Sequence, residues 1–222
     1  MSSLAGYATR FGPGLAPWVF VAIWSTGFVV AGGVIGRIDP HLFLSVRFAL
    51  VAAILFVACF VLGQRQPSRA IIVRLMILGL FLQGLYLGPG YWVVANGMPV
   101  GLIALIATLQ PPLTAIAASR MYGEKITPWL VVGLLLGMVG VGLAVAPGLV
   151  TFDQGQVTPL VLLVACLSIT CFTIGTLLQK GAGLNDVPLA VSTAWQNLAA
   201  AICTAVFAAM LGEDLFTVSI ES

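Results

Sequence analysis

Seven long apolar stretches, joined by short turns that carry most of the charge, constrain this chain more than any other sequence feature. A helix of about 20 apolar residues crosses a bilayer core about 30 Å thick. Only 7% of the 222 residues are charged, against about 25% in a typical soluble domain. The sequence therefore predicts an all-α polytopic membrane protein with seven transmembrane helices. The expected spans are Pro17–Gly36, Pro40–Leu62, Ile71–Ala95, Val100–Met121, Pro128–Ala146, Pro159–Leu178 and Pro188–Leu211.

The basic residues predict how these helices are oriented. With a cytoplasmic N-terminus, seven basic residues fall on the inner side: Arg10, Arg65, Arg69, Arg74, Arg120, Lys125 and Lys180. Only Arg37 then lies in an outer turn, and Arg47 lies within a span. Short loops rich in Lys and Arg stay in the cytoplasm. We therefore expect a multi-pass protein of the inner (plasma) membrane, with residues 1–16 as a cytoplasmic tail.

A weak internal repeat suggests how the spans are organised. The segment from Pro40, PHLFLSVRFALVAAI, aligns with that from Pro188, PLAVSTAWQNLAAAI, although two alanine-rich helices can also agree by chance. The copies are five helices apart, so they cross the membrane in opposite senses. Inverted repeats of this kind recur in secondary transporters. Two five-helix units would give ten helices, so we expect a truncated chain, with assembly from several chains as the alternative.

Arg47 is the charged residue that is most costly to hold within a span. It lies seven positions into the second expected helix. One interpretation is an anion-binding or gating residue that faces a water-filled cavity. The other is a side chain that extends to the outer headgroups while its aliphatic part stays among lipids.

Further polar and aromatic groups within the spans predict a substrate pathway. Gln196 and Asn197 need interhelical partners or water, and Pro111–Pro112 favours a kink in the fourth span. Glycines of the fifth span, by contrast, predict close helix packing. The expected pathway residues are Trp24, Thr26, Arg47, Tyr86, Gln110, Trp195 and Gln196.

The ordered motifs resemble the EamA domain of the drug/metabolite transporter superfamily. They are Trp24-Ser25-Thr26-Gly27-Phe28, Pro40 followed by Arg47-Phe48, the run Gly101 to Pro112, and Gly123-Glu124-Lys125. The resemblance implies one EamA unit over residues 17–146 and a partial second unit over 158–222. It also implies a ten-helix inverted-repeat fold and the export or exchange of small metabolites such as amino acids.

Other classes of protein lack support in the sequence. There is no G-x-x-x-x-G-K-[ST], G-x-S-x-G or H-E-x-x-H motif, so we expect no ATP-driven pump, no enzyme, no metal site and no cofactor. The basic residues lie singly between helices, which argues against nucleic-acid binding. We expect a small-molecule substrate and a lipid bilayer as partners, and a homo-oligomer is compatible with the sequence. A channel or a regulatory membrane subunit is the alternative function.

No Asp or Glu lies within the seven expected spans, so a proton carrier would have to be a carboxylate in a turn or beyond this chain.

Overall fold

The computed structural model describes residues 39–150, 157–184 and 186–213, and those residues form helices without strands. The first expected span, with Trp24 and Thr26, lies outside the described residues. The described elements are α3 (Pro40–Val61), α4 (Arg69–Gly79), the π-helical turn η1 (Leu80–Gly84), α5 (Leu85–Ala95), α6 (Val100–Ala107), α7 (Gln110–Tyr122), α8 (Pro128–Val150), α9 (Pro159–Gly181) and α10 (Leu189–Leu211).

Length and composition make five of the described segments candidate membrane spans. They are Pro40–Val61, Arg69–Ala95, Val100–Tyr122, Pro159–Gly181 and Leu189–Leu211, and a shorter apolar helix covers Pro128–Ala144. The all-α membrane architecture is therefore confirmed, and each candidate span overlaps one that the sequence predicts. The count of seven stays a prediction.

Proline and glycine set several of these helix boundaries. Pro40 lies in the first turn of α3, where the missing N–H group costs no intrahelical hydrogen bond. The fourth expected span is interrupted between Ala107 and Gln110, and Pro111 lies in the first turn of the new helix, as its proline pair predicts. Gly123 ends α7 with a φ of 68°, a left-handed conformation that glycine adopts without strain.

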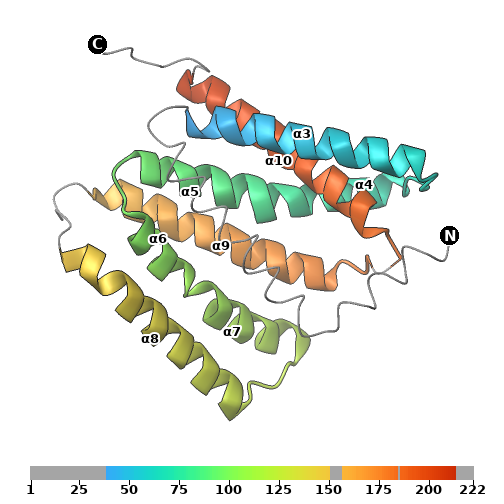
Figure 1. Cartoon of the computed structure of the whole chain (residues 1–222). Coiled ribbons are helices and arrows are strands. Elements are labelled where there is room, and N and C mark those ends of the chain that lie inside the picture. The colour runs from blue at the N-terminus through green and yellow to red at the C-terminus, as the bar shows by residue number, and fades with distance from the viewer. Residues whose placement is uncertain (1–38, 151–156, 185, 214–222) are drawn as a thin grey trace, which may run out of the picture.

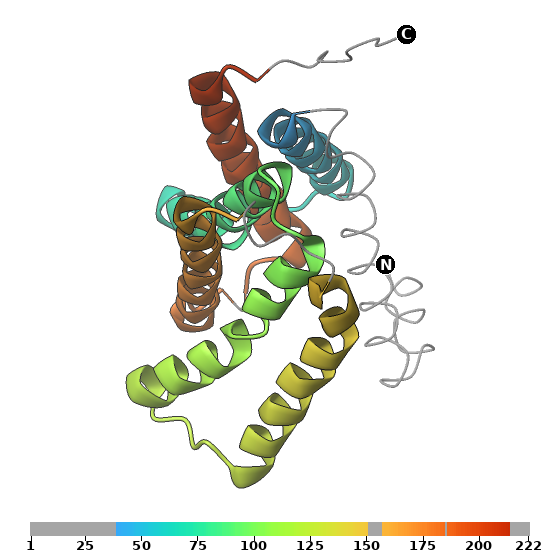
Figure 2. The ribbon, with the colours of Figure 1, turned by 90° about the vertical axis from the view of Figure 1, so that its left-hand side faces the viewer.

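Helices distant in the sequence lie side by side (Figure 1). α10 packs along α3 and also contacts α4 and η1, while α5 contacts α9. α9 in turn contacts α7, and α8 lies at the edge of the bundle against α6. Figure 2 shows α8 diverging from α7, and its main neighbour in the described chain is α6.

α3 and α10 run antiparallel. The start of α3 meets the end of α10 where His41 Nδ1 lies 2.5 Å from Glu213 Oε1. At the opposite end, Trp195 Nε1 in the second turn of α10 donates to Gln66 Oε1, just after α3, at 2.9 Å. Opposite senses are what the odd helix offset of the expected repeat requires. The repeat itself stays a prediction.

Other contacts also join ends that the alternating spans place on one side of the membrane. The hydroxyl group of Tyr122, at the end of α7, donates to the carbonyl oxygen of Leu177 near the end of α9 at 2.8 Å. Lys180 and Glu124 form an ion pair at the same end. At the other end, Val93 and Met98 pack with Val161 of α9. The up-and-down order of the described helices therefore agrees with the predicted alternation.

The third expected span contains an unpredicted π-helical turn between α4 and α5. Glycines bracket it on the side of α10. A Cβ atom on Gly79 would lie 2.1 Å from the Gln196 carbonyl oxygen, and one on Gly84 would lie 3.0 Å from Cys203 Sγ. These two helices therefore approach so closely that no larger residue fits at Gly79.

The fifth expected span differs from its prediction. Gly133, Gly137, Gly140 and Gly142 of α8 were expected to mark close helix packing, yet no atom of the described chain lies within 4 Å of a Cβ built on any of them. Close packing through glycine instead occurs at Gly79, Gly84 and Gly175. A spacing of small residues shows that a close approach is sterically allowed, but it does not determine which helix has a neighbour there.

Candidate transport site

Arg47 lies in the N-terminal half of α3 and reaches α5. Its guanidinium group interacts electrostatically with the side chain of Tyr91, and it lies 6.0 Å from the centre of the Phe48 ring. Tyr91 is 7% exposed, whereas Arg47 itself is exposed in the described chain. The contact with Tyr91 orients the cation towards another helix, which favours the binding or gating interpretation over a side chain that only extends to the headgroups.

Aromatic rings surround this contact. Phe43, one turn before Arg47 on α3, stacks on Tyr91 with ring centres 6.5 Å apart and planes 21° apart. Phe48 is 3% exposed and packs with Tyr91, Ala200 and other residues in one hydrophobic cluster. The cation therefore projects from a packed apolar wall, where low dielectric strengthens its attraction for an anion.

Tyr86 lies five residues before Tyr91 on α5 and packs against α9. Its ring stacks on Phe172, with centres 4.3 Å apart and planes 16° apart. The backbone carbonyl oxygen of Tyr86 also accepts a hydrogen bond of 2.8 Å from Ser168 Oγ. Tyr86 thus shares α5 with the partner of Arg47, but its ring is directed at a different helix.

Trp195 lies at the other end of α3. Its indole N–H donates to Gln66, and its ring meets the Phe56 ring edge-on at 5.0 Å and 81°. Phe56 is nine residues from Arg47, or about 14 Å along the helix. Arg47 and Trp195 therefore occupy different depths beside α3.

Gln196 and Asn197 satisfy their amide donors within α10. Gln196 Nε2 donates to Ser192 Oγ at 3.0 Å, and Asn197 Nδ2 donates to the Thr193 carbonyl oxygen at 2.8 Å. One amide donor of each residue is therefore satisfied without an interhelical partner, and the place of Gln196 in a pathway stays a prediction. Residues four apart share one helix face, so a local acceptor was within reach.

Gln110 also bonds locally, because its Nε2 donates to Thr114 Oγ1 at 2.9 Å. It lies on α7, which contacts α9 rather than α3. Of the expected pathway residues, Tyr86 lies on α5 and Arg47 reaches α5 through Tyr91. Trp195, Gln196 and Gln110 lie elsewhere in the described bundle, and a pathway joining all seven residues stays a prediction.

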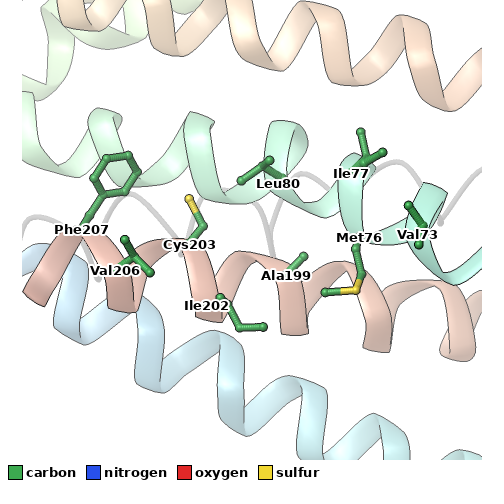
Figure 3. A pocket seen from close by; sticks show the side chains of 9 residues that line it. All are labelled: Val73, Met76, Ile77, Leu80, Ala199, Ile202, Cys203, Val206 and Phe207. Carbon is green, nitrogen blue, oxygen red and sulfur yellow. The ribbon is translucent and has the colours of Figure 1, made fainter.

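An apolar cavity of about 370 Å³ lies between α4, η1 and α10 (Figure 3). Its lining contains Met76 and Leu80 on one side and Cys203 and Phe207 on the other, and none of the expected pathway residues. This cavity offers no charged group to a solute, so it is distinct from the Arg47 site.

Two residues that sequence reasoning left outside the pathway form a buried contact. His41 and Glu213 side chains are 3% and 8% exposed and lie at the same end of the bundle. Their separation in the chain hides this pairing from the sequence. Tyr91 was also missed, and the only signal for it was a phenol placed beside the glycines and proline of the third expected span.

The described residues contain no group of three or more His, Cys, Asp or Glu side chains arranged to hold a metal ion. The groups around Arg47 are one guanidinium cation, aromatic rings and the hydroxyl group of Tyr91 among apolar helices. These helices and side chains are those of a multi-pass membrane protein.

The chain belongs to the EamA-like transporter family, whose model matches residues 15–146, and hence to the drug/metabolite transporter superfamily. One solved crystal structure aligns with this chain with a TM-score of 0.66 and 21% sequence identity. The alignment covers 86% of this chain and 65% of the chain in that structure. At that identity the likeness establishes the fold. This chain thus spans about two-thirds of that relative's length, and no curated protein matches it.

Proposed function

We propose that this protein is a secondary transporter that exports or exchanges small amino-acid-like or amphipathic metabolites across the plasma membrane, with its N-terminus in the cytoplasm. The observation that carries the proposal is the contact between Arg47 and Tyr91 within the membrane-spanning part of an EamA-family chain. Arginine forms charge-assisted, often bidentate hydrogen bonds with carboxylates. The Tyr91 hydroxyl keeps the guanidinium group oriented, and the Phe43 and Phe48 rings offer an apolar surface to the remainder of a solute.

Counterflow in proteoliposomes tests this proposal. Vesicles containing the purified protein would be loaded with unlabelled amino acids and supplied with a radiolabelled panel, alongside the corresponding amino-acid amides. A transporter that uses Arg47 accumulates the labelled carboxylates transiently and rejects the amides. A channel would give only leak without transient accumulation, and that result would contradict the proposal.

Arg47→Ala and Tyr91→Phe separate the roles of the two residues. Loss of a hydrogen bond to a charged group costs about 1.5–3 kcal/mol, so Arg47→Ala should raise KM by about tenfold or more. Tyr91→Phe retains the ring and should raise KM less, because the cation loses its orientation rather than its charge. Equal membrane abundance of the variants is the control. Unchanged transport by Arg47→Ala would refute the anion-binding role.

A further inference from the structure

The first turn of α3 is capped from the far end of the chain. Glu213 Oε2 accepts hydrogen bonds of 2.9 Å from the backbone N–H groups of both His41 and Leu42, while Oε1 faces His41 Nδ1. Asp39 occupies the N-cap position, where a local carboxylate usually accepts such bonds, yet its side chain makes no capping bond. Glu213, which follows α10, therefore caps the start of α3 and joins the outer ends of the two helices.

α3 and α10 end in the same way. The sequences are Leu62-Gly63-Gln64 and Leu211-Gly212-Glu213, and the glycines have φ angles of 62° and 66°. The N–H group of Gln64 donates to the Cys59 carbonyl oxygen at 2.9 Å, and that of Glu213 donates to the Ala208 carbonyl oxygen at 2.9 Å. Both bonds span five residues, as in a Schellman motif. Gln64 is thus the structural equivalent of Glu213.

The antiparallel arrangement places Gln64 at the end of the bundle where α10 begins. The hydrogen bond between Trp195 and Gln66 marks this end. α10 begins after Pro188, which has no side-chain acceptor and makes no capping bond. Among the described residues, Gln64 Oε1 is the buried side-chain atom without a hydrogen-bond partner. An acceptor is therefore left unpaired at the end of the bundle where α10 begins without a side-chain cap.

We propose that Glu213 and Gln64 are alternating caps that hold α3 and α10 together at one end at a time. In the state seen here, Glu213 caps α3 at the outer end. In the opposite state the outer ends separate, the inner ends approach, and Gln64 Oε1 accepts from the first-turn N–H groups of α10. The charge of Glu213 makes its cap the stronger one and favours the state observed.

The assignment of the two caps to the two states of a transport cycle rests on the proposed function. The caps themselves do not, because they are properties of the helix pair. Amide hydrogen exchange therefore gives a readout that needs no substrate. The probes are the amides of His41 and Leu42 for the outer cap, and those of Ala190 and Val191 for the inner cap, in the full chain in lipid nanodiscs.

Glu213→Gln should speed exchange at His41 and Leu42 by about threefold or more, because the cap loses its charge. It should slow exchange at Ala190 and Val191, because the inner cap becomes populated. Gln64→Glu should produce the same reciprocal change while leaving every present contact of the outer cap intact. Glu124→Gln, an exposed glutamate at the inner end, is the matched control and should change neither pair.

The double variant Glu213→Gln with Gln64→Ala decides the matter. It should retain fast exchange at His41 and Leu42 but lose the protection at Ala190 and Val191. If those two amides respond to neither Gln64 variant, the alternating caps do not exist, even in a protein that transports. If they respond as expected in a protein that fails counterflow, the caps stand and the proposed function falls.

Discussion

At the scale of single residues, Gly79 shows how one absent methyl group sets the distance between two spans. A Cβ atom there would lie 2.1 Å from the Gln196 carbonyl oxygen, and that atom belongs to a rigid helix backbone. α10 therefore cannot approach α4 this closely with any other residue at position 79. The same contact buries the backbone of Gln196, whose side chain bonds within its own helix.

Gly79→Ala should accordingly destabilise the protein, although alanine favours helix formation. Overpacking costs about 1–3 kcal/mol, which exceeds the gain of up to about 1 kcal/mol from replacing a helical glycine with alanine. Gly137→Ala is the matched control, since nothing in the described chain lies within 4 Å of its Cβ position. Thermal unfolding in detergent should give a lower Tm for Gly79→Ala and an equal or higher Tm for Gly137→Ala. Equal shifts would contradict the close contact.

At this scale, the sequence showed which residues are energetically costly within a span, but not which side chains lie next to them. Arg47 was recognised because a charge within a span is expensive wherever the helix lies. Tyr91, His41 and Glu213 were not recognised, because their roles depend on which helix lies beside them. Gln196 was interpreted as needing an interhelical partner, although a serine four residues earlier was an available acceptor.

At the scale of elements, the span from Arg69 to Ala95 depends on its π-helical turn. Gly79 and Gly84 both face α10, although five residues of a regular α-helix turn the chain to positions about 140° apart. A π turn closes a hydrogen bond between residues i and i+5, so it brings such positions onto one face. The turn therefore allows both glycines to meet the same neighbour.

Deletion of Phe81 should convert the π turn into regular α-helix, because a π turn holds one residue more than the α-helical turn it replaces. Gly79 and Gly84 would then be four residues apart, or about 40° around the helix, and would still share the face towards α10. We therefore expect the deletion variant to remain folded in size-exclusion chromatography, with a Tm close to that of Phe81→Ala. Phe81→Ala is the control, because it removes the same side chain but keeps the residue count. A deletion variant that is lost from the folded fraction while Phe81→Ala folds would contradict this account of the π turn.

Helix boundaries were predictable to within a few residues, because prolines, glycines and charges mark them locally. The π turn was not predictable, because it depends on where α10 contacts Gly79 and Gly84. The glycines of α8 were misinterpreted for the same reason: a small side chain permits a neighbour but does not supply one.

At the scale of the whole molecule, the basic residues predict one orientation in the membrane. Replacing the four native cysteines and adding Asn96→Cys or Lys125→Cys gives two exposed reporters in turns that the helix order places on opposite sides. A membrane-impermeant maleimide should label position 96 in intact cells, and position 125 only after permeabilisation. The reverse pattern would overturn the orientation but leave the helix packing unchanged.

The antiparallel pairing of α3 and α10 also bears on biosynthesis. α3 begins at Pro40 and α10 at Leu189, so about 150 residues of translation separate the two helices. A ribosome adding about 5–20 residues per second needs roughly 7–30 s for that distance. Through this interval the nascent chain carries α3 without its principal neighbour, and His41 without its carboxylate. Bilayer insertion of the early helices and completion of the bundle are therefore separate events. The bundle is completed only after the ribosome has synthesised α10.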